Sequence, residues 1–301
     1  MAGARFGLSL DPLEGFVTLV WPPTGIALGC LVRFGPWLWP GIAAGALVAN
    51  RWSGAPWFVA AGIALGNTLE ALLGARILRW TRGGRGPIRR LRQAAALLAS
   101  ALLSPVVSAS VGVLCLWLAG ITPLNRELAT WQAWWLGDVL GALVVAPVVT
   151  NWDPRFFLGW SRARWLEAAF LAAAVLASAA LSFSGGPTTP LQQPHMIFPV
   201  LIWAALRFGP PAAACSVLAA AAIAIAFTAD GRGPYAIGPL HERLTTLQGF
   251  MGNAAITTLF LAAGRAERVR ALESLRHKRR ALEQALGARD EFLSIASHEL
   301  R

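Results

Sequence analysis

Charged residues are scarce in this sequence, and their scarcity excludes most classes of soluble protein. Only 14% of the 301 residues are charged, whereas 56% are hydrophobic, and the mean hydropathy is +0.55. A soluble chain of this length needs far more polar surface to face water. The composition therefore predicts an integral membrane protein.

Lysine is almost absent, since Lys278 is the single lysine among 26 basic residues. The formal net charge of +11 could attract nucleic acid. Most of the arginines, however, lie in short loops between apolar runs or after the last run, as the positive-inside rule describes for membrane proteins. We therefore expect no nucleic-acid partner.

Cysteine is rare as well, and its positions exclude a disulfide or metal framework. Cys30, Cys115 and Cys215 each sit inside an apolar run, without a C-x-x-C spacing or a neighbouring histidine. We interpret them as packing residues and expect no metal site.

The beginning of the chain lacks a signal peptide, because residues 1–14 have no charged start followed by an apolar core of about 7–15 residues. Ala4–Leu10, followed by Asp11 and Pro12, instead resembles the end of a helix whose beginning is missing. Either the true start lies upstream or the first span is short.

Apolar runs separated by Pro, Gly and Arg occupy most of the chain. A membrane span needs about 20 apolar residues, and several runs reach that length. Two runs, 36–50 and 195–207, are shorter, and we interpret each as a tilted, re-entrant or half span. The predicted runs are 15–33, 36–50, 56–80, 93–120, 131–150, 165–184, 195–207, 210–229 and 243–264.

The arginines indicate how these spans are oriented. If the loops alternate between the two sides of the membrane, the sparse side holds only Arg51, Arg126, Arg232 and Arg243. The other side should be cytoplasmic, and the last span then enters the cytoplasm at Gly264. The arginines on that side are Arg33, Arg76, Arg79, Arg82, Arg85, Arg89, Arg90, Arg92, Arg155, Arg162, Arg164 and Arg207.

After Arg265 the composition changes to charged residues and leucine. Leucines 272, 275, 282, 286 and 293 follow the spacing of a coiled-coil seam, although Arg279 and Arg289 also occupy seam positions. We expect a parallel dimeric signalling helix; the alternative is a helix lying on the membrane, with Arg276–Arg280 on anionic lipid. The predicted fold class is all-α: a polytopic transmembrane helix bundle of eight or nine spans, followed by a cytoplasmic coiled-coil signalling helix.

Two carboxylates lie inside predicted spans, where an ionisable group is costly and marks a possible site. Glu70 has Asn67 three residues earlier on the same helical face. At about 1.5 Å per residue, Asp138 lies roughly 10 Å from the outer end of its run and Glu70 roughly 20 Å. The two residues either form a pocket or relay that senses a ligand, ion or proton, or are paired across helices and only hold the bundle together.

The segment Trp21-Pro-Pro-Thr-Gly25 interrupts an apolar run. Two prolines remove two backbone donors, and such a break at membrane depth must be covered by protein or line a cavity, unless it is a simple kink. Three glycine pairs at i, i+4 spacing predict close helix packing, namely Gly41/Gly45, Gly62/Gly66 and Gly137/Gly141.

The last residues, Arg289–Arg301, resemble the first half of the phosphoacceptor motif of histidine kinases. Phe292 stands six residues before His298, and Ser297, Glu299, Leu300 and Arg301 also match. In that chemistry a neutral imidazole nitrogen attacks the γ-phosphorus of ATP, and a neighbouring carboxylate acts as acid or base. His298 is therefore the expected phosphoacceptor and Glu299 the expected acid/base. The alternative is an amphipathic helix that carries these residues by coincidence.

Five further motifs resemble signatures of the first class of MASE (membrane-associated sensor) domains, in the right order over residues 5–264. They are Trp21–Ala27, Leu38–Gly41 with Asn50, Gly66–Ala71, Leu136–Gly141 with Pro147, and Trp203–Gly209. The resemblance implies perception of a signal within the membrane. It carries over Trp21 to Gly25, Asn67, Glu70, Asp138 and Arg207 as candidate ligand-binding positions for an unknown ligand.

Together the two resemblances imply a bacterial sensor histidine kinase. The expected parts are a sensor domain at 1–264, a coiled-coil linker at 265–288 and the beginning of the phosphoacceptor domain at 289–301, in a multi-pass protein of the bacterial inner membrane with a cytoplasmic C-terminus. The expected cofactor is ATP with Mg, bound by a kinase domain that this sequence does not include. A response regulator, membrane lipid and a membrane partner protein are the further partners expected.

The main alternative function is a transporter or channel that uses Glu70 and Asp138 as a proton or cation path. Transporters usually contain internal repeats with matched broken helices, and each half of the chain has a Pro-Pro break, at Pro22-Pro23 and at Pro210-Pro211. No convincing repeat surrounds these breaks. A scaffold that senses only through a partner protein in the bilayer is the third possibility.

Overall fold

The computed structural model describes residues 20–82, 87–123, 125–153, 156, 158–185, 193–236 and 240–299. These residues form helices and connecting turns without a strand among them, which confirms the all-α fold class. The expected helix end at Ala4–Leu10 and the predicted cytoplasmic arginines Arg85 and Arg155 lie outside the described residues.

Each predicted apolar run corresponds to a helix or to a short series of helices. The run 15–33 is described from Val20 onward and becomes helical at Pro22. The elements are α2 (Pro22–Phe34), η1 (Pro36–Leu38), α3 (Trp39–Trp52), α4 (Trp57–Arg82), α5 (Leu91–Leu103), α6 (Pro105–Leu118), α7 (Glu127–Asn151), α8 (Arg162–Phe183), η4 (Pro194–Ile197), α9 (Phe198–Trp203), η5 (Ala204–Phe208), α10 (Pro210–Ala229) and α11 (Leu240–Glu299).

Five helical segments of the described chain are long and apolar enough to cross a membrane: α4, the pair α5–α6, α7, α8 and α10. Both runs predicted to be short are irregular. The run 36–50 has one 3₁₀ turn before α3, and the run 195–207 is a mixture of 3₁₀, α and π turns over Pro194–Phe208. The ninth run forms the first part of α11, which continues for 60 residues.

Helix α7 lies at the centre of the bundle and packs against α2, α5, α6, α10 and α11. Its residues from Gly137 to Pro147 are all buried, as expected for a helix that is apolar on every side. Helix α8, in contrast, exposes Leu166, Phe170 and Leu181 to the outside. In a membrane these side chains face lipid, so α8 is a peripheral span.

Two of the three glycine pairs lie where helices pack closely. Gly62 and Gly66 of α4 face Cys115 and Val111 of α6. Gly141 of α7 faces the backbone of Trp21. Gly41 and Gly45 have open space beside them, so close packing within this chain does not explain that pair.

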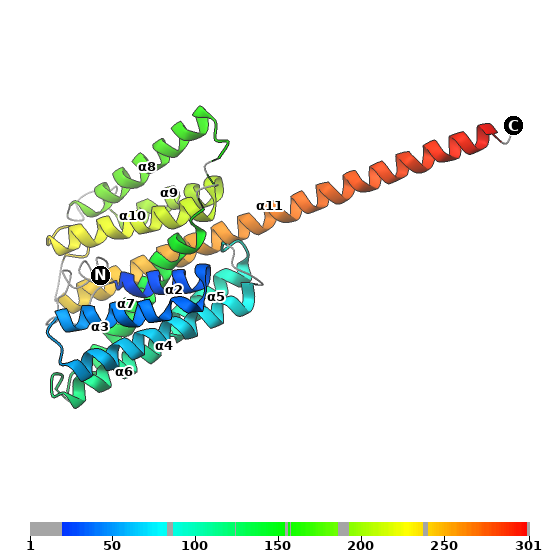
Figure 1. The fold of residues 1–301 in the computed structure, drawn as a ribbon. Helices are drawn as coiled ribbons and strands as arrows, with labels where there is room; N and C mark the ends of the chain where they lie inside the picture. The colour runs from blue at the N-terminus through cyan, green and yellow to red at the C-terminus, as the bar shows by residue number, and fades with distance from the viewer. Residues whose placement is uncertain are drawn as a thin grey trace.

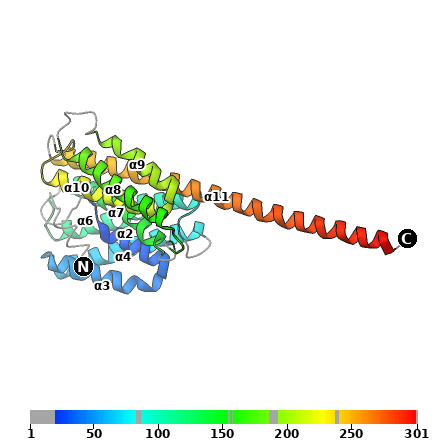
Figure 2. The ribbon, with the colours of Figure 1, turned by 90° about the horizontal axis from the view of Figure 1, so that it is seen from above.

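Helix α11 runs through the bundle and then leaves it as one unbroken helix (Figures 1 and 2). In Figure 1, α8, α9 and α10 lie on one side of it and α2, α3, α4 and α6 on the other. It leaves at the end of the bundle where α5 begins, because Leu91 packs against Gly264. The arginines near this end include Arg89 and Arg90 beside α5, and Arg164 and Arg207 near Arg265.

Candidate functional site

Asp138 of α7 is the centre of a buried polar cluster. Its side chain is 1% exposed. Thr24 of α2 donates a hydrogen bond from Oγ1 to Oδ1 at 2.6 Å, and the Ser108 hydroxyl of α6 lies 3.1 Å from Oδ2. Three helices therefore meet at this one carboxylate.

The Trp-Pro-Pro-Thr-Gly segment places Thr24 at that position. Pro22 and Pro23 form the first turn of α2, where backbone N–H groups have no partner within the helix and their loss costs little. The Trp21 N–H donates to the carbonyl oxygen of Gly137 at 3.0 Å. The start of α2, which is the positive end of its dipole, is thus held beside Asp138.

Gly25 and Gly141 make this approach possible. A Cβ at Gly25 would lie 2.6 Å from Val145 Cβ and would overlap the carbonyl oxygen of Gly141. A Cβ at Gly141 would in turn overlap the carbonyl oxygen of Trp21. The backbones of α2 and α7 therefore touch next to the carboxylate.

Glu70 of α4 is also 1% exposed, and it lies close enough to Asp138 for their charges to interact. Both of its carboxyl oxygens are buried without a hydrogen-bond partner. The Ser108 hydroxyl is near Glu70 as well, but it points to Asp138 Oδ2 and to the Pro105 carbonyl. Glu70 therefore has no hydrogen-bond donor that is not shared with Asp138.

The helix bounds place Asp138 further along its helix than the predicted run suggested. Helix α7 begins at Glu127 rather than near residue 131, so Asp138 lies about 16 Å along it. Glu70 lies about 20 Å along α4, which begins at Trp57. Counted from the first residue of each helix, the two carboxylates therefore lie at similar positions along α4 and α7.

Of the predicted ligand-binding positions, Trp21, Glu70 and Asp138 belong to this cluster, and Asn67 lies one turn before Glu70. Arg207 does not belong to it. Its guanidinium forms two hydrogen bonds to Glu167 of α8, at 2.5 and 2.9 Å, and thereby ties η5 to α8. A ligand-binding role of these five residues stays a prediction.

Sequence reasoning did not single out Ser108, and it included Thr24 only as part of the Pro-Pro motif. Hydroxyl side chains are common in membrane helices, where they often bond to their own backbone, as Thr68 does to Ala64. The sequence thus contained no signal that separates Ser108 from the serines beside it. Its position on α6 opposite Asp138 is what distinguishes it.

A second polar contact joins the bundle to α11. Asn151, at the end of α7, accepts a hydrogen bond from the Ile88 N–H at 2.7 Å. Three residues later, the Leu91 N–H donates to Oε2 of Glu267 on α11 at 2.9 Å. Partial desolvation and the nearby charges of Arg89 and Arg90 lower the pKa of Arg270, one turn further along α11. The segment 88–91 therefore links α7 to α11.

We expect Glu267→Ala to loosen this link, because it leaves the first N–H of α5 without its acceptor. Loss of a helix cap typically costs about 1 kcal/mol, which corresponds to a fall of about 2–3 °C in the unfolding midpoint. Hydrogen exchange of the peptide covering 88–93 should also become faster. Glu273→Ala, one and a half turns away on α11, is the control and should leave the unfolding midpoint and the exchange rate unchanged. Equal effects from the two variants would contradict the hydrogen bond between Leu91 and Glu267.

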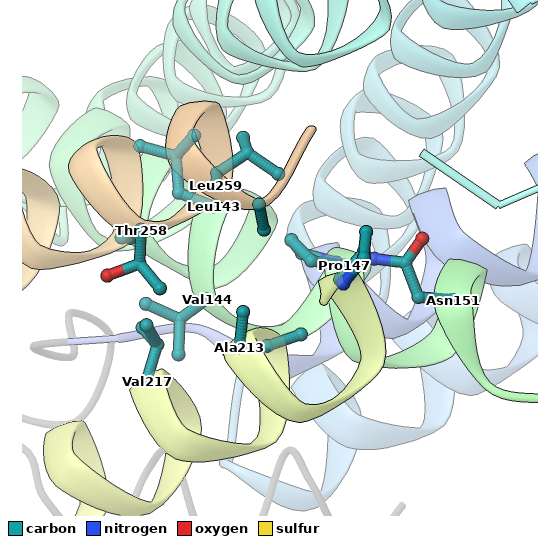
Figure 3. Close-up of a pocket in the computed structure, with 12 residues that line it drawn as sticks. Leu143, Val144, Pro147, Asn151, Ala213, Val217, Thr258 and Leu259 are labelled. Atoms are coloured by element: carbon teal, nitrogen blue, oxygen red, sulfur yellow. The ribbon is translucent and has the colours of Figure 1, made fainter. Parts of the chain in front are cut away.

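The region where α7, α10 and α11 meet is closely packed, and Figure 3 shows the residues around it. Pro147 of α7, Ala213 of α10 and Thr258 of α11 line a crevice of about 10 Å³, which is room for one water at most. A larger hollow of about 190 Å³ lies between α8 and α10 and is lined mainly by apolar groups such as Trp160, Trp165 and Phe208. Neither space includes the two carboxylates.

The backbone of α11 includes His298 and Glu299, whose side chains lie outside the described part of the structure, as does Leu300-Arg301. Among the described residues, no cluster of three or more His, Cys, Asp or Glu side chains could hold a metal ion.

Comparison with known proteins gives one family and one relative. The MASE1 family model matches residues 3–268. The probable diguanylate cyclase DgcE of Escherichia coli (strain K12) is 28% identical over 160 residues, which are 52% of this chain and 13% of that protein. The chain therefore covers only a small part of its relative's length. No solved structure matches it significantly.

Proposed function

This chain belongs to the MASE1 family, and on that premise we propose that it is the sensor input module of a two-component histidine kinase. The membrane sensor domain follows from family membership and from the apolar helices. The kinase output is the proposed part, and it rests on the sequence Ser297-His-Glu-Leu-Arg301.

The structural observation that supports the proposal is the continuity of α11. The same helix lines the crevice beside α7 and α10 through Ala255 and Thr258, contacts α5 through Glu267, and extends to Glu299. From Gly264 to His298 it covers about 50 Å at 1.5 Å per residue. A rotation or shift of its first part is therefore passed along the helix to the phosphoacceptor.

Exposed leucines on α11 support a homodimer. Leu272, Leu275, Leu282 and Leu286 are 44–62% exposed in the single chain, and they follow the predicted seam. Pairing two copies of α11 would bury this apolar row. The proposed parts remain the sensor domain at 1–264, the linker at 265–288 and the start of the phosphoacceptor domain at 289–301.

In the proposed mechanism a signal shifts the bundle between two packings of similar energy, and α11 changes the access of His298 to a kinase domain. That domain would bind ATP with Mg; the imidazole of His298 attacks the γ-phosphorus and displaces ADP, and Glu299 assists as acid or base. The phosphate then passes to an aspartate of a response regulator. This requires α11 to leave the membrane on the cytoplasmic side, which the arginines at that end support.

A cyclic-di-GMP output is the second candidate, because the relative is a probable diguanylate cyclase. The two outputs use different nucleotides and can be separated in one experiment. Full-length protein in membrane vesicles is incubated with labelled ATP and, in parallel, with GTP. We expect acid-labile phosphate on the protein and no cyclic di-GMP; the reverse result would overturn the kinase and establish the cyclase.

A further inference from the structure

We propose that Glu70 and Asp138 form a carboxyl–carboxylate pair that holds a single exchangeable proton, so that the centre of the bundle is a proton-binding site. Whether the pair binds a proton does not depend on the output domain. The inference that this proton acts as the signal rests on the proposed sensor function.

The first argument is the absence of a compensating cation. The groups that face the pair are neutral: Thr24 of α2, Ser108 of α6 and Trp134 of α7. Asn67 lies one turn before Glu70, and Ser100 of α5 and Ser104, which follows α5, lie beside the next turn of α4. Among the described residues, no arginine, lysine or histidine forms an ion pair with either carboxylate.

The arginine side chains that the structure describes on α2 and α4 point elsewhere. Arg33 lies nine residues after Thr24 and donates to the Val149 carbonyl at 3.3 Å. Arg79 donates to the Ala75 carbonyl of its own helix, and Arg76 is exposed. Two neighbouring carboxylates in a buried site without a cation cannot both be ionised, because their repulsion adds to the desolvation of each charge.

The hydrogen bonds indicate which residue carries the proton. Asp138 has the Thr24 and Ser108 hydroxyls and the start of α2 beside it, all of which favour an ionised carboxylate. Neither oxygen of Glu70 has a hydrogen-bond partner of its own, and the Ser108 hydroxyl near it is shared with Asp138. A proton on Glu70 converts one of these oxygens into a donor that can be shared with Asp138, so the geometry assigns the proton to Glu70.

The same side chains fit a proton better than a metal ion. Two carboxylates and two hydroxyls supply few ligands, and the described residues contain no metal-binding cluster. Sodium, which needs fewer charges than a divalent ion, is the competing occupant and is included in the experiment.

Helix α7 connects the pair to the signalling helix. Leu140 lies two residues after Asp138 and faces Gly252 of α11, and Pro147 follows where α7 meets α10 and α11. Proline removes a backbone hydrogen bond from α7 and gives the helix a natural bending point. Loss of the proton would add a second buried charge next to α2 and change how these helices pack.

Infrared spectroscopy of the full-length protein in lipid nanodiscs tests the proposal directly, because a buried protonated carboxyl has a carbonyl band separate from ionised carboxylates. We expect this band near neutral pH, a shift of it in D₂O because the proton exchanges, and its loss as one proton is removed at higher pH. Glu70→Gln should remove the band, whereas Glu167→Gln, a Glu-to-Gln change at the ion-paired glutamate of α8, should leave it.

A wild-type spectrum without the band, a band that does not exchange, or a band that survives Glu70→Gln would overturn the proton site. Loss of the band on adding sodium at constant pH would also overturn it and assign the site to a cation. A Glu70 band together with phosphorylation that does not respond to Glu70→Gln would leave the proton site standing and overturn only its role as the signal. If instead the wild-type protein shows no phosphorylation at all, it is the proposed kinase that fails.

Discussion

Replacing His298 by glutamine in the full-length protein is expected to reduce acid-labile phosphate incorporation from ATP to background. A glutamine amide nitrogen is not a nucleophile, so the phosphoryl group has no acceptor at that position. Glu299→Gln should slow the same step, within the range of about 10²–10⁴-fold that general acid–base groups supply. The measurement is the label retained on the protein in membrane vesicles before and after acid treatment.

His277 is the matched control for this prediction. It lies on the same helix and is exposed, so His277→Gln should incorporate as much phosphate as the wild type. Label that persists in His298→Gln, or disappears equally in His277→Gln, would assign the phosphoacceptor to another residue. Both variants contain the complete sensor bundle, and their folding can be compared by thermal unfolding before the assay.

Gly141→Ala is expected to destabilise the bundle, although it adds one methyl group. That methyl would overlap the Trp21 carbonyl oxygen, and backbone cannot move aside as a side chain can. Overpacking of this kind costs about 1–3 kcal/mol, which predicts a fall of several degrees in the unfolding midpoint. The same displacement moves Thr24 away from Asp138, so the hydrogen bond between them should weaken.

Gly45→Ala is the matched control, and we expect it not to destabilise the protein. Gly45 lies in α3 with open space around the position of its Cβ, so alanine meets no neighbour and favours the helix slightly. We expect its unfolding midpoint to equal or exceed that of the wild type. If Gly141→Ala were equally harmless, the close contact of α2 with α7 would not contribute to stability.

Hydropathy predicted the spans well because the hydropathy of a segment depends only on the residues in that segment. The runs 56–80 and 210–229 correspond to α4 and α10 within a few residues. A helix that spans a membrane must be apolar along most of its length, so its composition alone indicates where it begins and ends. Among the five long apolar segments, the largest difference between a predicted and an observed bound is at the start of α7, which begins at Glu127 rather than at residue 131. Polar residues at a membrane surface continue a helix without contributing to its hydropathy.

The sequence by itself determined that the chain is an all-helical membrane protein, that its arginines gather at one end, and that Glu70 and Asp138 are unusual. Only the tertiary structure decided that these two carboxylates meet, that Thr24 and Ser108 bind Asp138, and that Arg207 pairs with Glu167 instead. Whether two side chains meet depends on the depth and rotation of one helix against another. Those are set by close contacts such as Gly25 against Gly141, which belong to pairs of helices and are invisible in either segment alone.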